Sequence, residues 1–222
     1  ANGTADITQK PAMTKAELYR CIETGIGLVK CAKEDRVKLL VTGEMGIGNT
    51  TTSAAMAVAL LSVPPEIVAG RGAGLSDEGL ATKRRVIADA LEKYQLRGTE
   101  PMRILCSVGG LDIAGLCGVF LGGAKYHMPI VADGVISAVA ALTAERLCPG
   151  TKEFIIPSHK GKEPASELLM RELGLSPVID AGLALGEGTG AVMMFSLLDI
   201  AMSLYETGAT FGDFKIEEYH RF

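Results

Sequence analysis

The fold is decided by residues 37–52, VKLLVTGEMGIGNTTT. Val37–Val41 is a short apolar run that predicts a buried strand, and it ends at Gly43. A loop that contains Gly43, Gly46 and Gly48 leads from there to a helical pattern that begins near Asn49. Where a strand, a glycine loop and a helix N-terminus meet, backbone N–H groups and the helix dipole form an anion site. The stretch therefore predicts an α/β protein that can bind an anion here.

The glycine loop nearly matches the phosphate loop of nucleotide-binding proteins, G-x-x-x-x-G-K-[ST]. Asn49 stands where that motif has a lysine that reaches the outer phosphates of a triphosphate. This difference argues against an ATPase or GTPase and leaves a cradle suited to one phosphate. The alternative is a tight turn from strand to helix with an ordinary Asn or Thr cap.

On either side of this stretch, short apolar runs alternate with helical patterns. We expect strands at 129–132, 154–156 and 178–180, and helices at 14–32, 77–94, 111–124, 134–147, 163–173 and 189–205. The pattern predicts an α/β fold with a Rossmann-like parallel sheet, helices on both faces, and ligands beyond the carboxyl ends of the strands. We expect an N-terminal helical segment (1–35), an α/β core (36–206) and a C-terminal tail (207–222).

Two further glycine loops precede helices. Gly70–Gly74 leads to a helix whose Lys83 could reach back to a phosphate or a carboxylate, or could lie on a solvated face. The loop GEGTG places Glu187 at a helix start, where it either complements the helix dipole or serves as a base in a cleft. Asp133 and Asp180 lie at the ends of predicted strands and could equally be caps or ribose contacts.

Composition excludes several classes of function. The net charge of −4 gives no reason to expect nucleic acid or an anionic membrane as a partner. The longest apolar run, Ala54–Leu61, is too short to span a bilayer. The five cysteines are scattered and lack a CxxC pair, which favours a reduced, cytoplasmic setting. The three histidines lie far apart, so we expect no metal and no cofactor.

Taken together, the motifs resemble those of the nicotinate-nucleotide–dimethylbenzimidazole phosphoribosyltransferase family, which makes the lower-ligand nucleotide of cobalamin. The resembling segments follow the family's order and cover nearly the whole chain: GEMGIGNTTT (43–52), GRGAGLSDEGLATK (70–83), SVGGLDIAGLCG (107–118), IVADGVISAVAA (130–141), PSHKGKEP (157–164) and LGEGTGA (185–191). The pairing of GEMGIGNTT with a later LGEGTGA is specific to this family.

The resemblance implies a reaction and a set of site residues. Nicotinate mononucleotide and a benzimidazole-type base such as 5,6-dimethylbenzimidazole would give α-ribazole 5′-phosphate and nicotinate. Glu187 would be the general base. The residues implied to bind substrate are Glu44, Gly46, Ile47, Gly48, Asn49, Thr50, Gly72, Lys83, Leu185 and Gly186.

The resemblance also implies a homodimer. Two departures from the family pattern affect substrate binding. We expect that an N-terminal portion of the family, which contributes to that pocket and to a small helical part, is missing here. Gly161 also stands where some relatives have a serine. The alternatives are a phosphorylated-nucleotide-binding protein without catalysis and a module that binds nucleoside triphosphates.

Overall fold

A parallel sheet in the order β1-β2-β3 organises the computed structural model, which describes residues 2–72, 74–210 and 212–214. The strands are β1 (Leu40–Val41), β2 (Ile130–Ala132) and β3 (Ile155–Pro157). The central strand β2 is completely buried, while β1 is half-buried at an edge of the sheet. The predicted α/β class with a parallel sheet is confirmed.

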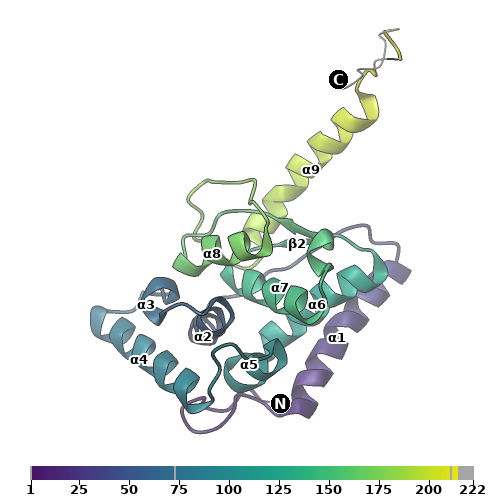
Figure 1. Cartoon of the computed structure of the whole chain (residues 1–222). Helices are drawn as coiled ribbons and strands as arrows, with labels where there is room; N and C mark the ends of the chain where they lie inside the picture. Colours follow the sequence, from purple (N-terminus) through teal and green to yellow (C-terminus); the bar gives the residue numbers. More distant parts are fainter. Residues whose placement is uncertain (1, 73, 211, 215–222) are drawn as a thin grey trace, which may run out of the picture.

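Helices cover both faces of this sheet (Figure 1). Ile130 and Ala132 of β2 belong to the main hydrophobic core, whereas Val131 packs with Ala191 and Met194 on the other face. The helices are α1 (Lys15–Glu34), α2 (Thr50–Leu61), α3 (Pro65–Val68), α4 (Asp77–Lys93), α5 (Pro101–Val108), α6 (Leu111–Tyr126), α7 (Val135–Leu147), α8 (Pro164–Leu173) and α9 (Thr189–Thr207), with a 3-10 turn η1 (Thr151–Phe154). Because successive side chains of β2 point to opposite faces of the sheet, α6 and α7 pack on one face and α9 packs on the other.

Two predicted strands are shorter than the apolar runs that suggested them. The run 37–41 forms a strand only at Leu40–Val41, because β1 pairs only with β2 and only these two residues are in register with it. In the run 178–180, Ile179 makes a single isolated bridge to His159. The short helices α3 and α5 were not expected, although each begins with a proline, which favours a helix start.

The α1 helix packs against α6 through glycines. A capping box starts this helix, with Thr14 and Glu17 bonded to each other's backbone N–H groups. At the contact, a Cβ on Gly118 would lie 2.2 Å from the carbonyl oxygen of Ile22, and one on Gly25 would lie 2.1 Å from that of Gly115. Only glycine allows the two backbones to approach this closely.

The last helix leaves the body of the molecule. Its first turns cover Val131, but its outer half projects away with few contacts (Figure 1). The tail expected at 207–222 lies largely outside the described residues, which end at 214 and omit 211. Within the described part of the chain, no helix combines the length and the apolar character needed to cross a bilayer.

Candidate active site

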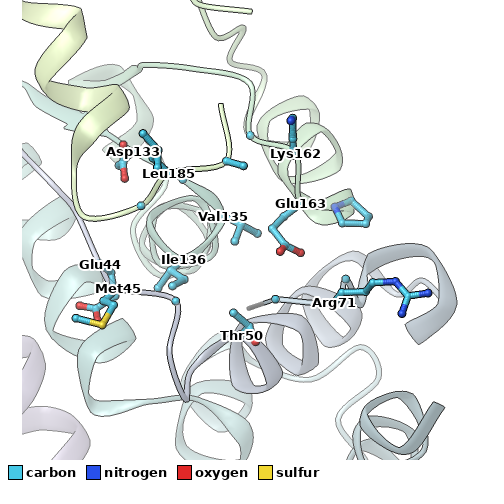
Figure 2. A pocket seen from close by; sticks show the side chains of 18 of the residues that line it. Glu44, Met45, Thr50, Arg71, Asp133, Val135, Ile136, Lys162, Glu163 and Leu185 are labelled. Atoms are coloured by element: carbon cyan, nitrogen blue, oxygen red, sulfur yellow. The ribbon is translucent and has the colours of Figure 1, made fainter. Parts of the chain in front are cut away.

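A cavity of about 710 Å³ opens at the carboxyl end of the parallel sheet. Its lining includes a residue that follows each strand: Glu44 after β1, Asp133 after β2 and His159 after β3. In Figure 2, Glu44 and Glu163 flank the space, with Val135 and Ile136 between them. The cavity has the size and the position expected of a ligand site in a parallel α/β fold.

The start of α2 forms one wall of this cavity. Gly46, Ile47 and Thr50 line it, and Ile47 is 74% exposed. The first turn of α2 contains no acidic residue, and Asn49 makes no capping hydrogen bond with its side chain. The positive end of the helix dipole is therefore available to an anion such as a phosphate.

The second glycine loop is tied to the start of α2 by Lys83. This lysine is only 5% exposed, and its Nζ donates to Thr50 Oγ1 at 3.2 Å and to the Gly70 carbonyl at 2.9 Å. Burial lowers the pKa of Lys83, and the nearby Glu163 carboxylate opposes that shift. Gly72 comes so close that a Cβ on it would lie 2.8 Å from Thr50 Oγ1. Lys83 thus holds the two loops together.

Glu44 belongs to a cluster with Asn49 and Asp112. The Asn49 amide is 8% exposed and donates to Asp112 Oδ2 at 2.7 Å and to Glu44 Oε1 at 3.4 Å. Its side chain is thus engaged behind the loop, and Gly48, Asn49 and Lys83 are not among the cavity-lining residues. Burial raises the pKa of Glu44, and the like charge of the Asp112 carboxylate raises it further.

The third glycine loop brings Glu187 to the same cavity as Gly46 and Ile47. Glu187, Leu185 and Gly186 all line it, and the Glu187 side chain is exposed. The Glu187 N–H donates to the Glu44 carbonyl at 3.2 Å, which ties the third loop to the first. Glu187 adopts the left-handed conformation, with φ of 62°, which is costly for a residue with a side chain.

Asp133, which the sequence left open between a cap and a ribose contact, caps α9. Its carboxylate accepts hydrogen bonds from the N–H groups of Gly188 at 3.0 Å and Ala191 at 3.1 Å. Asp180, the other candidate, has a side chain that is 74% exposed, and it does not line the cavity. The position of Asp133 directly after a buried strand was the signal, but only the fold shows which helix it reaches.

His159 and Glu163 line the cavity without having been singled out as site residues from the sequence. Both lie in the segment PSHKGKEP, between β3 and α8, and His159 is only 2% exposed. Gly161 lines the cavity beside them. Across residues 2–72, 74–210 and 212–214, no group of three or more His, Cys, Asp or Glu side chains is placed to hold a metal ion.

This arrangement defines a class of protein: an α/β fold whose glycine-rich loops gather at the carboxyl end of a parallel sheet, around a cavity lined by a helix N-terminus and three glutamates. The chain belongs to a phosphoribosyltransferase family, whose sequence profile matches residues 1–216. The resemblance drawn from the glycine loops is thereby confirmed.

Similar proteins place the chain within that family. It is 46% identical over 217 residues to the nicotinate-nucleotide–dimethylbenzimidazole phosphoribosyltransferase of Acetivibrio thermocellus, and 45% identical to that of Ruminiclostridium cellulolyticum. Each comparison covers 98% of this chain and 62% of the relative, so the chain spans about three fifths of their length. The crystal structure of CobT from Thermus thermophilus matches with a TM-score of 0.89 at 38% identity, over 97% of this chain and 64% of that one.

Proposed function

We propose that this chain transfers a phosphoribosyl group from nicotinate mononucleotide to 5,6-dimethylbenzimidazole or a related base. The products would be α-ribazole 5′-phosphate and nicotinate, for the nucleotide loop of cobalamin. The names of its relatives support this reaction. The observation that carries the proposal is the 3.2 Å hydrogen bond from the Glu187 N–H to the Glu44 carbonyl, because it fixes the candidate base beside the candidate phosphate loop.

The donor phosphate would bind at the start of α2. Gly46, Ile47, Thr50 and Gly72 line the cavity at this position, and Gly48 belongs to the same loop. Backbone N–H groups with the helix dipole would stabilise the negative charge. The two buried side chains behind these loops, Asn49 and Lys83, would act by keeping them in place. Much of the rate would then come from holding donor and acceptor in line.

Glu187 would act as the general base. The acceptor base attacks C1 of the ribose through one ring nitrogen while nicotinate leaves from a cationic pyridinium nitrogen and takes the bonding electron pair. Nicotinate departs neutral at nitrogen, so its departure requires no acid. The second ring nitrogen of the acceptor loses its proton to the Glu187 carboxylate, a role typically worth about 10²–10⁴-fold in rate. Attack opposite the leaving group inverts the anomeric carbon from β to α.

Leu185 and Gly186 would bind substrate next to the base. Both line the cavity and precede Glu187, and Leu185 is 65% exposed. The Glu44 carboxyl lines the same cavity, where burial and the Asp112 carboxylate raise its pKa. Together these groups would orient the acceptor so that its N–H points to Glu187.

We also propose a homodimer in which α9 contributes to the interface. The outer half of α9 exposes Ile200 at 59%, Leu204 at 68% and Tyr205 at 86%. An exposed apolar surface of this kind typically marks a protein–protein contact.

A cytoplasmic location is proposed as well, since all five cysteines are free thiols, as is usual in a reducing compartment.

Product analysis tests the reaction. The chain is incubated with nicotinate mononucleotide and 5,6-dimethylbenzimidazole, and the products are identified by chromatography and mass spectrometry. We expect nicotinate and α-ribazole 5′-phosphate in equal amounts. Binding of nicotinate mononucleotide without turnover would contradict catalysis and favour the non-catalytic alternative, which is consistent with the chain's span of about three fifths of its relatives. Magnesium-dependent ATP binding, with no affinity for nicotinate mononucleotide, would contradict both the proposed transferase and the non-catalytic alternative.

A further inference from the structure

Asp133 provides the N-terminal cap of α9 from a distant part of the chain. The N-cap residue of this helix, Gly188, has no side chain, and the first turn of α9 contains no acidic residue. The Asp133 carboxylate takes this role by accepting from the N–H groups of Gly188 through Oδ2 and of Ala191 through Oδ1. A carboxylate at this end of a helix is stabilised by the helix dipole as well as by the two bonds.

The carboxylate is held in an enclosed position. Asp133 is 2% exposed and lies 3.7 Å from Nδ1 of His159. Because the Ser158 hydroxyl donates to the Ala132 carbonyl at 2.7 Å, His159 Nδ1 must donate to Ser158 Oγ at 3.0 Å. The imidazole ring is therefore fixed, and it closes one side of the space around Asp133.

The residue directly before the capped helix is Glu187, whose backbone conformation needs restraint. Glu187 and Gly188 are both left-handed, with φ of 62° and 84°. For a residue with a side chain, this conformation persists only where the surroundings impose it. On one side the Glu44 carbonyl accepts from Glu187 N–H, and on the other Asp133 accepts from Gly188 N–H.

The backbone of the first loop completes the restraint. A Cβ on Gly43 would lie 2.4 Å from the Gly188 nitrogen, so the two chain segments are in direct contact. Gly190 rests against the His159 ring, where a Cβ would lie 2.0 Å from Nδ1. The start of α9 is thus enclosed by segments that follow all three strands.

We propose that Asp133 is a positioning residue: by capping α9 it fixes the direction in which the Glu187 carboxylate enters the cavity. This inference rests on the proposed function, in which Glu187 is the base. Asp133 would act through Glu187 and would not bind the ribose. Loss of the cap would let residues 186–192 move, and a displacement of about 1 Å at a reacting group can cost about 10²-fold in rate.

Hydrogen exchange tests the positioning without any need for activity. In Asp133→Asn, the amide NH₂ can no longer accept from a backbone N–H, so one of the two capping bonds is lost. We expect faster exchange confined to the backbone N–H groups of 186–192, measured by mass spectrometry on the whole chain. The matched control is Asp180→Asn, which changes an aspartate next to the isolated bridge at Ile179, with a side chain that is 74% exposed. Unchanged exchange at 186–192 in Asp133→Asn would overturn the inference.

Kinetics then separate positioning from substrate contact. We expect Asp133→Asn to lower kcat by about tenfold or more and to leave KM for nicotinate mononucleotide within about twofold. In a Glu187→Gln background the same change should alter the residual rate by less than about twofold, since the two residues act as one unit. A raised donor KM with unchanged kcat, or fully additive losses, would contradict the proposal.

The outcomes also distinguish the inference from the proposed function. If the wild-type chain forms no product but 186–192 still loosens in Asp133→Asn, the capping role stands and the reaction assigned to the site is wrong. If Asp133→Asn gives no folded protein by circular dichroism, Asp133→Ser is measured in the same way. Serine is smaller, so it creates no clash, and its shorter side chain cannot bridge both N–H groups.

Discussion

The main-chain N–H of Glu187 donates to the main-chain carbonyl of Glu44 across 3.2 Å. This bond joins the loop after β1 to the residue before α9, and both side chains line the same cavity. Two glutamates that the sequence places in separate motifs therefore share one site. Because the bond is between backbone atoms, it persists when either side chain is replaced. The two carboxyl groups can thus be tested separately.

Replacing Glu187 by Gln should remove base catalysis and retain donor binding. The amide cannot take a proton, so we expect kcat to fall by about 10²–10⁴-fold. Calorimetry should show affinity for nicotinate mononucleotide within a few-fold of wild type, since the proposed phosphate cradle is backbone at the start of α2. Glu92→Gln, on the exposed face of α4 away from the cavity, is the control. Lost donor binding in a folded Glu187→Gln protein would refute the assigned role.

Glu44 should make stability depend on pH. Its pKa is raised above 4.5 by burial and by Asp112, so the folded state holds this proton more tightly than the unfolded state does. The stabilisation is fully present below about pH 4.5 and is lost as pH rises through the folded pKa. As pH rises through this window, the free energy of unfolding of the wild type should therefore fall relative to that of Glu44→Gln. The fall should be under about 1 kcal/mol, because solvent reaches the side chain.

Urea denaturation of both proteins from pH 4 to pH 7.5 measures this difference. Asp112→Asn serves as the second comparison, because it removes the like charge and should shift the window to lower pH. A difference between wild type and Glu44→Gln that stays constant over the whole range would be inconsistent with a raised pKa.

Two glycines on α6 should respond in opposite directions to the same change. A Cβ at Gly118 would lie 2.2 Å from the Ile22 carbonyl oxygen, whereas one at Gly115 would have no neighbour within 4 Å. We expect Gly118→Ala to lower the free energy of unfolding by about 1–3 kcal/mol through overpacking. Gly115→Ala should raise it by up to about 1 kcal/mol, since alanine favours the helix. Urea denaturation compares them, and equal effects would contradict the α1–α6 contact.

A charge on the outer part of α9 should weaken self-association. Leu204 is 68% exposed, and burying an unpaired carboxylate there in a dimer would be costly. Leu204→Glu should raise the dimer Kd by about tenfold or more in sedimentation velocity. Leu28→Glu changes a leucine that is 61% exposed on α1 and serves as the control. A wild-type chain that is monomeric at high concentration would contradict the proposed interface.

Local patterns in the sequence predicted most of the secondary structure and the position of the cavity. The capping box at Thr14 and the glycine loop ending at Asn49 are local signals, and both mark helix starts as expected. The direction of the Asn49 side chain could not be predicted from the sequence, because its hydrogen-bond partner Asp112 comes from α6. The same holds for Asp133, whose role as a cap depends on α9 crossing the sheet at β2. Contacts between distant segments are set by packing, which a single sequence does not encode locally.

The close contact between α1 and α6 limits how the chain can be divided. Because the Ile22 carbonyl lies against Gly118, α6 presents mostly backbone where another helix would present side chains. In a fragment that begins at residue 36, the α6 surface that packs against α1 would be exposed to solvent. This surface offers little apolar area on which another segment could pack. We expect such a fragment to be recovered from cells in low yield, and co-expression of residues 1–35 as a separate peptide to restore it.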